Sequence, residues 1–337
     1  MKRVVTMIFT VCLVLCAVVR GFAANAGSRA SFTRGDTIGA RYVAFGGTGE
    51  AIADDVYAIY WNPAGLSRLS DVDVKSPDEI RKKAEKGDVS GVTEEDLLAF
   101  TDANRKFSMQ FGLSAARLDV ERNTMFGGAA MTFAHGVLGI GAYSIFSNGI
   151  EEYNESGDRT GSGNYSGSVG YVSYGLPMGP SAIGFSVKGL YERISDATYS
   201  GLSFDCGAQA ELLPFIKIGF VAQDIGAGLF PMKGKNVKKE YDFASPTLRV
   251  SAAVSSRSSD ISFGFGVVRH LEQDRFLFNA GVRYDPSETI SLSIGFCDKN
   301  FGAGVGWKIW HCEAWYAFSY DRIGLGYNNS ISLSVTY

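Results

Sequence analysis

Cysteine, histidine and proline are scarce in this 337-residue chain, and the scarcity of cysteine excludes two ways of holding a fold together. Of the five cysteines, only Cys206, Cys297 and Cys312 lie beyond the first 26 residues. Three is an odd number and no Cys-x-x-Cys spacing occurs, so neither a disulfide framework nor a zinc site is indicated. The three histidines are isolated and show no metal-ligand spacing, and we expect no metal and no cofactor.

Beyond residue 26 the sequence also lacks a long continuous apolar run, which argues against a membrane-spanning helix. The net charge of -3 and the pI of about 5.7 give no reason to expect nucleic acid as a partner. No nucleophile and base combine into a catalytic constellation, and the glycine-rich segment 302–308 lacks the spacing of a phosphate-binding loop. We therefore expect a protein that is not an enzyme.

Residues 1–26 have the pattern of a cleaved signal peptide. Lys2 and Arg3 precede an apolar run from Val4 to Val19. This run is shorter than the roughly 20 residues that a spanning helix requires. Residues 24–26, Ala-Asn-Ala, offer a cleavage site with small residues at the required positions. The chain is therefore predicted to be exported.

Glycine (41 residues), tyrosine (16) and phenylalanine (23) are abundant, and from about residue 106 the apolar residues follow a period of two. Ile290, Leu292, Ile294 and Phe296, for example, alternate with serine and glycine. Such alternation is typical of strands with one apolar face. We predict fourteen strands of about ten residues, in the segments 106–117, 123–134, 136–148, 164–176, 181–193, 198–211, 213–223, 246–257, 259–268, 275–285, 288–296, 300–309, 311–320 and 328–337.

The connections between these segments alternate in length. Those after even-numbered segments are short, and those after odd-numbered segments include the long ones, 149–163 and 224–245. Short turns at one end, longer loops at the other and strands of about ten residues are typical of outer-membrane barrels. The last segment alternates up to Tyr337, and a terminal strand ending in an aromatic residue resembles the signal read by the barrel-assembly machinery.

The predicted fold class is therefore all-β: a transmembrane outer-membrane β-barrel of about fourteen antiparallel strands at 106–337, in contact with the lipid of a bacterial outer membrane. A barrel of this size encloses a lumen that small side chains cannot fill. The strand face opposite the apolar one carries mainly glycine, serine and alanine, so another part of the chain is expected to plug the lumen.

The remaining residues, 27–105, are interpreted as that plug, an amino-terminal hatch. Its most apolar stretch, 54–66, contains Asn62, Pro63 and Ala64, where the proline lacks an N–H and pushes the preceding residue out of the helical region. Segment 76–103 is expected to form a short, strongly polar helical insertion, because Ser76 and Glu79 make a capping box at its start.

The pattern Asp-Asp-x-x-Ala-x-x-x-Asn-Pro-Ala-Gly-Leu at 54–66 resembles the hatch of the FadL-type outer-membrane transporters of long-chain fatty acids and other hydrophobic compounds. The form with a preceding glycine-rich run is similar to the smaller FadL-like proteins of spirochaetes and to the PorV-like proteins of Bacteroidetes. The resemblance implies Asn62, Pro63 and Ala64 as the hatch motif. It also implies an uptake channel for hydrophobic small molecules, with long-chain fatty acids expected to diffuse passively past a gating hatch.

Two groups of residues are the candidates for contact with such a ligand. One group is apolar and lies in the hatch or in the predicted loop 224–245: Tyr57, Ile59, Tyr60, Trp61, Leu229 and Phe230. The other group offers ammonium groups for a carboxylate: Lys233, Lys235, Lys238 and Lys239. The alternative function is that of a PorV-like barrel that docks partner proteins or serves in secretion, with 76–103 and 224–245 as the contacts.

Overall fold

The computed structural model describes residues 32–69, 108–118, 122–154, 156–233, 242–256, 260–271, 276–298, 300–321 and 326–337. The predicted signal peptide at 1–26 and the predicted polar helices at 76–103 lie outside these residues.

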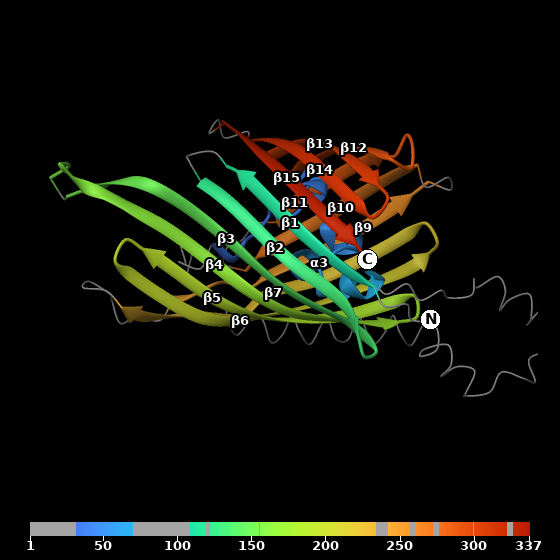
Figure 1. Cartoon of the computed structure of the whole chain (residues 1–337), viewed down its shortest axis with the longest axis horizontal. Coiled ribbons are helices and arrows are strands. Elements are labelled where there is room, and N and C mark those ends of the chain that lie inside the picture. The colour runs from blue at the N-terminus through green and yellow to red at the C-terminus, as the bar shows by residue number, and fades with distance from the viewer. Residues whose placement is uncertain are drawn as a thin grey trace, which may run out of the picture.

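Fourteen strands of the described residues close into one antiparallel barrel (Figure 1). Each strand pairs with its neighbours in sequence, and the ring closes where β1 pairs with β15. An additional two-residue strand, β8, pairs with β7. The strands are β1 (Met109–Arg117), β2 (Arg122–Phe133), β3 (Gly136–Tyr153), β4 (Arg159–Met178), β5 (Ser181–Ile194), β6 (Ala197–Leu213), β7 (Ile216–Lys233), β8 (Asp242–Phe243), β9 (Thr247–Ser255), β10 (Ile261–His270), β11 (Phe276–Tyr284), β12 (Ile290–Cys297), β13 (Asn300–Ile309), β14 (Cys312–Asp321) and β15 (Gly326–Thr336).

The predicted fold class is confirmed, but two predicted loops are wrong in extent. In the segment predicted as loop 149–163, β3 continues to Tyr153 and β4 begins at Arg159. Both faces of this hairpin are exposed, so the alternation of apolar and polar residues stops while the ladder of hydrogen bonds continues. In the segment predicted as loop 224–245, β7 continues to Lys233 beyond a bulge at Asp224, which interrupts its period.

The barrel is apolar outside and polar inside. On β1, for example, Phe111 and Leu113 are exposed on the outer face, whereas Gln110 and Ser114 are buried in the lumen. Similar exposed aromatic and aliphatic side chains occur on strands all round the ring. An outward apolar band over a polar lumen is the arrangement of a barrel that contacts lipid. No helix in the described ranges is both long and apolar enough to span a bilayer.

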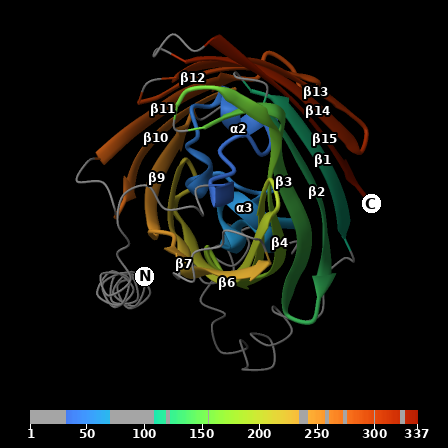
Figure 2. The ribbon, with the colours of Figure 1, turned by 90° about the vertical axis from the view of Figure 1, so that its left-hand side faces the viewer.

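Residues 32–69, called the hatch below, lie inside the barrel (Figure 2). They form four short helices, α2 (Ala40–Ala44), η3 (Gly49–Ala51), α3 (Ala58–Trp61) and η4 (Pro63–Leu69). After α2 the chain reverses at Gly46 and Gly47, both at φ 71°, a left-handed conformation that glycine adopts without penalty. Figure 2 shows α2 beside β12 and β13 and α3 on the opposite side of the lumen.

The hatch backbone approaches the wall backbone more closely than any side chain would permit. A Cβ atom at Gly184 would lie 2.2 Å from the backbone nitrogen of Ala64, and one at Gly219 would lie 2.1 Å from the carbonyl oxygen of Glu50. Real Cβ atoms do not come this close to other heavy atoms. The same holds round the ring at Gly175, Gly281 and Gly295. These five residues are called the glycine ring.

The inward polar side chains satisfy the irregular hatch backbone, which has little regular secondary structure of its own. Ser114 Oγ accepts from the backbone N–H of Gly39 at 3.1 Å, and Ser251 Oγ accepts from that of Ala51 at 2.8 Å. The small and polar residues of the inward face therefore form the seat of the hatch: glycines leave room for its backbone, and hydroxyl and amide groups complete its hydrogen bonds. Gln209 and Gln223 do so toward the carbonyls of Glu50, Ala53 and Tyr60.

Replacing Gly184 by valine should therefore displace the hatch from β5 and destabilise the folded barrel by about 1–3 kcal/mol, the cost typical of overpacking. Gly189 provides the matched control, since it lies on the same strand with open space around it. The measurement is the urea midpoint of both variants in lipid vesicles, followed by circular dichroism. Equal midpoints for Gly184→Val and Gly189→Val would contradict the role of the glycine ring.

Candidate functional site

The turn at Asn62, Pro63 and Ala64 ties three parts of the chain together. Helix α3 ends at Trp61 because Pro63 holds Asn62 in an extended conformation, at φ -165° and ψ 106°. The Asn62 side chain then serves both sides of the turn. Its Oδ1 accepts from the Ala64 N–H at 3.1 Å, while its Nδ2 donates to the carbonyls of Glu50 at 2.7 Å and Ala208 at 3.1 Å.

The Asn62 side chain has no exposed surface. Its hydrogen bonds join its own turn to η3 and to strand β6. The sequence predicted the turn from its proline. It could not predict these partners, because one of them lies 146 residues away.

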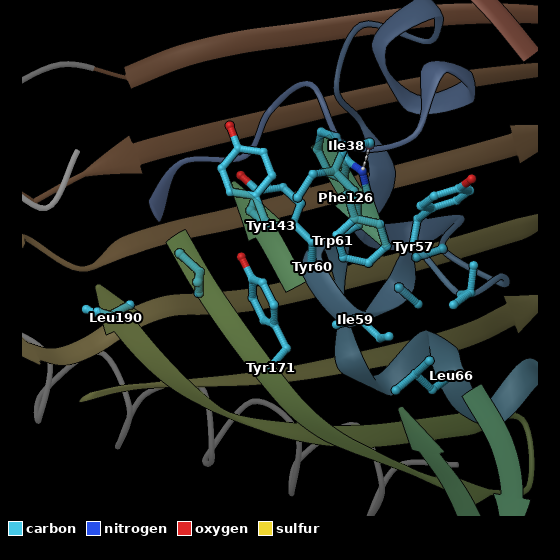
Figure 3. Close-up of a cluster of buried hydrophobic side chains, with 14 of the residues drawn as sticks. Ile38, Tyr57, Ile59, Tyr60, Trp61, Leu66, Phe126, Tyr143, Tyr171 and Leu190 are labelled. Atoms are coloured by element: carbon cyan, nitrogen blue, oxygen red, sulfur yellow. Dashed lines mark hydrogen bonds between the residues drawn. The ribbon is translucent and has the colours of Figure 1, made fainter. Parts of the chain in front are cut away.

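The hatch residues predicted to face a ligand form a closed aromatic core. Tyr57, Ile59, Tyr60 and Trp61 are each at most 3% exposed. The ring of Trp61 lies 5.3 Å from that of Tyr42 and 5.2 Å from that of Tyr60, and its Nε1 donates to the carbonyl of Ile38 at 2.8 Å. Figure 3 shows this core beside Tyr143 and Tyr171, which come from strands of the wall.

The aromatic core continues into the wall as one apolar cluster. Its wall members share inward positions on β2 to β7: Phe126, Ala130, Val137, Tyr143, Val169, Tyr171, Leu190, Tyr199, Ala227 and Leu229. The structure therefore brings Leu229 together with the hatch aromatics. It does not do so for Phe230, which lies on the other face of β7 and is 46% exposed. Lys233 ends β7, and the other three candidate lysines, Lys235, Lys238 and Lys239, lie outside the described residues.

A buried arginine on β9 fixes the outer side of the hatch, and sequence reasoning missed it. Arg249 donates to the carboxylate of Asp36 at 2.5 Å and to Oε1 of Gln223 at 2.8 Å, and its Nη1 lies 3.7 Å from Glu50. Its guanidinium also lies 5.5 Å from the ring of Trp61, within cation–π range. A charged residue on the polar face of a predicted strand was the available signal, but its partners were not evident.

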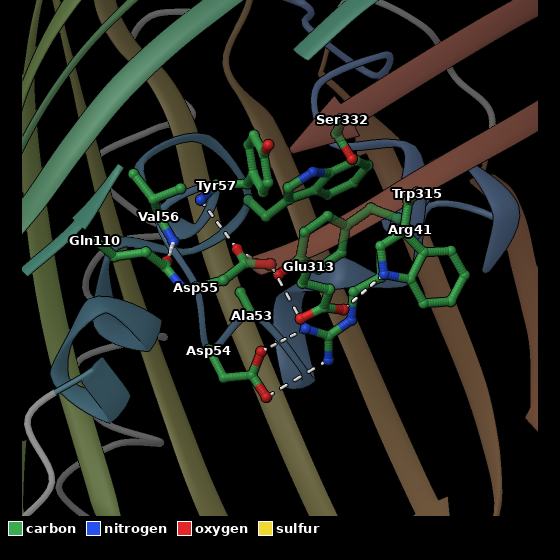
Figure 4. Close-up of polar contacts among 12 residues, drawn as sticks. Arg41, Ala53, Asp54, Asp55, Val56, Tyr57, Gln110, Glu313, Trp315 and Ser332 are labelled. Carbon is green, nitrogen blue, oxygen red and sulfur yellow. Dashed lines mark hydrogen bonds and ion pairs between the residues drawn. The ribbon is translucent and has the colours of Figure 1, made fainter. Parts of the chain in front are cut away.

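A second charged cluster lies within the hatch, beside Gln110 of β1 and Glu313 of β14 (Figure 4). Arg41 donates to Asp54 at 2.8 Å and lies 3.5 Å from Asp55. Asp55 Oδ1 also accepts from the Tyr42 hydroxyl and the Tyr57 N–H, each at 2.9 Å. One guanidinium therefore faces two adjacent carboxylates.

The pKa values of these two carboxylates shift in opposite directions. Burial would raise the pKa of Asp54, but the charge of Arg41 outweighs it and holds that pKa below its usual value. Burial raises the pKa of Asp55 to about 7, helped by the charges of Asp54 and Glu313 and opposed by Arg41 and the hydrogen bond from Tyr42. Asp55 thus titrates in the physiological range.

Comparison with known proteins agrees with this architecture. No family model matches the chain, and no curated protein matches it. Among solved structures, the toluene transporter TodX of Pseudomonas putida matches with a TM-score of 0.57 at 11% identity, over 88% of this chain and 96% of that one. The CymD monoaromatic hydrocarbon channel matches with a TM-score of 0.57 at 10% identity, over 89% and 96%.

A FadL homologue of Pseudomonas aeruginosa also matches, with a TM-score of 0.53 at 10% identity, over 93% of this chain and 99% of that one. The chain therefore has the fold of the FadL-type outer-membrane channels, and the resemblance seen in the hatch sequence is confirmed at the level of fold. The three neighbours are transporters and channels rather than enzymes. The narrower likeness to spirochaete or PorV-like proteins stays a prediction.

Replacing Asn62 by alanine removes three buried hydrogen bonds and leaves backbone groups unpaired, which should cost about 1–3 kcal/mol of stability. The exposed Asn164 on the barrel rim, whose side-chain Oδ1 accepts from the Gly149 N–H at 3.3 Å, provides the control. Urea unfolding in vesicles compares Asn62→Ala with Asn164→Ala. A destabilisation no larger than that of the control would show that the turn does not anchor the hatch.

The raised pKa of Asp55 predicts how the stability of the hatch depends on pH. Its pKa is raised on folding from the ordinary 3.8, so the neutral carboxyl favours the folded state, and this stability is lost as the pH rises toward and through about 7. Hydrogen exchange of the hatch amides, corrected for the intrinsic pH dependence, should therefore become less protected between pH 5.5 and pH 8.5. Asp55→Asn should flatten this dependence; an unchanged dependence in that variant would count against the assignment.

Proposed function

We propose that the protein is an outer-membrane channel through which hydrophobic small molecules enter the cell, with the hatch closing the lumen between passages. One observation carries this proposal. The hatch places an aromatic core inside the lumen, and this core packs in one cluster with apolar side chains of β2 to β7. A barrel built for ions or sugars keeps a polar, water-filled lumen, whereas this lumen offers an apolar solute contacts along the wall.

The fold supports the same proposal. TodX is described as a toluene transporter and CymD as a monoaromatic hydrocarbon channel, and both share this fold. The strand extensions at the end opposite the short turns, where β3 pairs with β4 and the start of β6 pairs with the end of β7, would be the first part of the chain to meet a solute from outside.

Long-chain fatty acids are the substrates that the hatch sequence and the lysines at 233–239 lead us to test first. An alkyl chain would lie against the apolar cluster, and an ammonium group from this lysine segment would meet the carboxylate at the rim. Passage then requires the hatch to move, because the aromatic core leaves Tyr60 and Trp61 at most 2% exposed. The docking alternative rests on 76–103 and on the lysine segment, and no described residue favours it.

Uptake by proteoliposomes tests the proposed function. Purified protein should speed the entry of a fluorescent long-chain fatty acid and of a neutral alkylbenzene above the rate of protein-free liposomes. An unrelated barrel of similar size serves as the control for leakage. If neither compound enters faster than in the control, the channel function is wrong; if only the alkylbenzene does, the fatty acid is the wrong substrate.

Gating by the hatch gives a further expectation. Pro63→Ala frees the conformation of Asn62 and should change the rate of uptake by about threefold or more, since the closed turn would no longer be preset. Pro286→Ala, in an exposed turn between β11 and β12, is the matched control. Unchanged uptake in Pro63→Ala would indicate that the turn does not take part in opening.

A further inference from the structure

Inward-facing residues that pair across neighbouring strands form two rows on β3 to β7, each running from strand to strand. The pairing Tyr143↔Val169↔Leu190↔Gly201↔Leu229 places apolar side chains side by side, and this set is called the apolar row. The next inward positions toward the short turns pair as Gly141↔Tyr171↔Lys188↔Ser203. The apolar row therefore borders directly on a polar one.

A buried charged cluster completes the polar row. Lys188 Nζ lies 2.6 Å from Asp205 Oδ1 and 2.5 Å from Asp224 Oδ1, and all three side chains are at most 5% exposed. Asp224 reaches this place because it adopts φ 61° at a bulge of β7, a conformation rare for any residue but glycine. One ammonium between two carboxylates leaves the cluster, called the acidic cluster below, with a net negative charge.

Two polar atoms beside this ion pair have no hydrogen-bond partner among the described residues. They are Oδ2 of Asp205 and the phenolic oxygen of Tyr171, both with no accessible surface. Buried polar atoms are almost always paired, and each exception calls for an explanation such as a ligand or an ordered water. Here an unused acceptor and an unused hydroxyl lie in the same patch of wall.

The first residues of the hatch occupy the space in front of this patch. The hydroxyl of Thr33 donates to Asp224 Oδ2 at 2.9 Å, and the ring of Phe32 lies on Gly167, where a Cβ would be 2.5 Å from its Cγ. Phe32 belongs to the same apolar cluster as Val169, Leu190 and Leu229. The chain itself thus presents an aromatic ring to the apolar row and a hydroxyl to the acidic cluster.

We propose that the apolar row and the acidic cluster form a binding subsite for uncharged hydrophobic compounds that carry a hydrogen-bond-donating hydroxyl, such as alkylphenols, and that it disfavours carboxylates. The inference rests on the proposed channel function and sets its selectivity: of the two compounds in the uptake test, the neutral alkylbenzene should pass this subsite more readily than the ionised fatty acid. A ligand hydroxyl would take the place of the Thr33 hydroxyl on Asp224, and its ring would take that of Phe32. A carboxylate can only accept, and it would face a net negative cluster whose single ammonium is already paired.

Glu192 strengthens this selectivity. It lies on β5 two residues from Leu190, on the rim side of the apolar row, and is 1% exposed. Tyr165 donates to its Oε1 at 3.2 Å. A carboxylate lying along the apolar row would therefore have carboxylates at both ends of the subsite.

Equilibrium binding of three probes with one carbon skeleton tests the proposal: 4-propylphenol, propylbenzene and 4-propylbenzoate, each titrated at pH 7.5 into the full chain in lipid nanodiscs, with empty nanodiscs subtracted. The phenol should bind about fivefold more tightly than propylbenzene, the effect of one net hydrogen bond. It should bind at least about tenfold more tightly than the benzoate, which meets like charges in a site of low dielectric constant.

Two threonines of the hatch give a matched pair of variants. Thr33→Val removes the hydroxyl that competes for Asp224 while keeping the shape of the side chain, and should tighten phenol binding by about threefold or more. Thr48 donates its side-chain hydroxyl to the carbonyl of Phe45 and lies beside Gly264 on β10, away from the acidic cluster, so Thr48→Val should leave phenol binding unchanged. Propylbenzene should respond to neither variant.

The outcomes separate this inference from the proposed function. Benzoate binding as tight as that of the phenol, or equal effects of Thr33→Val and Thr48→Val, would overturn the subsite while leaving the channel in place. Absence of binding for all three probes, together with no uptake in proteoliposomes, would overturn both.

Discussion

The structure depends on one steric constraint: the hatch backbone and the wall backbone lie in contact, with no side chain between them at the glycine ring. Gly184 and Gly219 illustrate it, because any larger residue would overlap a hatch carbonyl or amide. The constraint links composition to architecture. Glycine on the inward face of a strand would weaken an ordinary sheet, but here the lost side-chain packing is replaced by contact with the hatch, which fills a lumen that would otherwise stand open.

Polar groups at the contact between hatch and wall fix the position of the hatch in the barrel. Serine and glutamine side chains complete the backbone hydrogen bonds of the hatch, and Arg249 ties Asp36 of the hatch to β9, while Arg41 pairs with Asp54 inside the hatch. Such hydrogen bonds are individually modest and can be exchanged for bonds to water. The apolar contacts of the aromatic core, by contrast, cannot be replaced by contacts with water. A hatch held by exchangeable bonds at its edge and by apolar contacts at its centre suits the passage of apolar solutes.

Sequence alone predicted the barrel well because a lipid-facing strand repeats a two-residue pattern. The segment 300–309 was predicted with the bounds that β13 has. Prediction failed where the pattern carries no information. The hairpin of β3 and β4 is exposed on both faces, and β7 continues past its bulge at Asp224 into the predicted loop. Consecutive residues of a strand point to opposite faces, so Phe230 does not join Leu229 in the lumen. The hydrogen bond between Thr33 and Asp224 joins residues that are 191 positions apart. Such contacts could not be predicted from the sequence, because they depend on how the closed barrel and the hatch fit together.

The ion conductance of the protein in a planar lipid bilayer tests the central claim, that an apolar hatch seated on the glycine ring closes the lumen. A fourteen-stranded barrel with an empty lumen would pass a steady ionic current, since its interior exceeds what side chains fill. The account predicts no stepwise current from the inserted wild-type protein. A stable, porin-like open current at low voltage would contradict it.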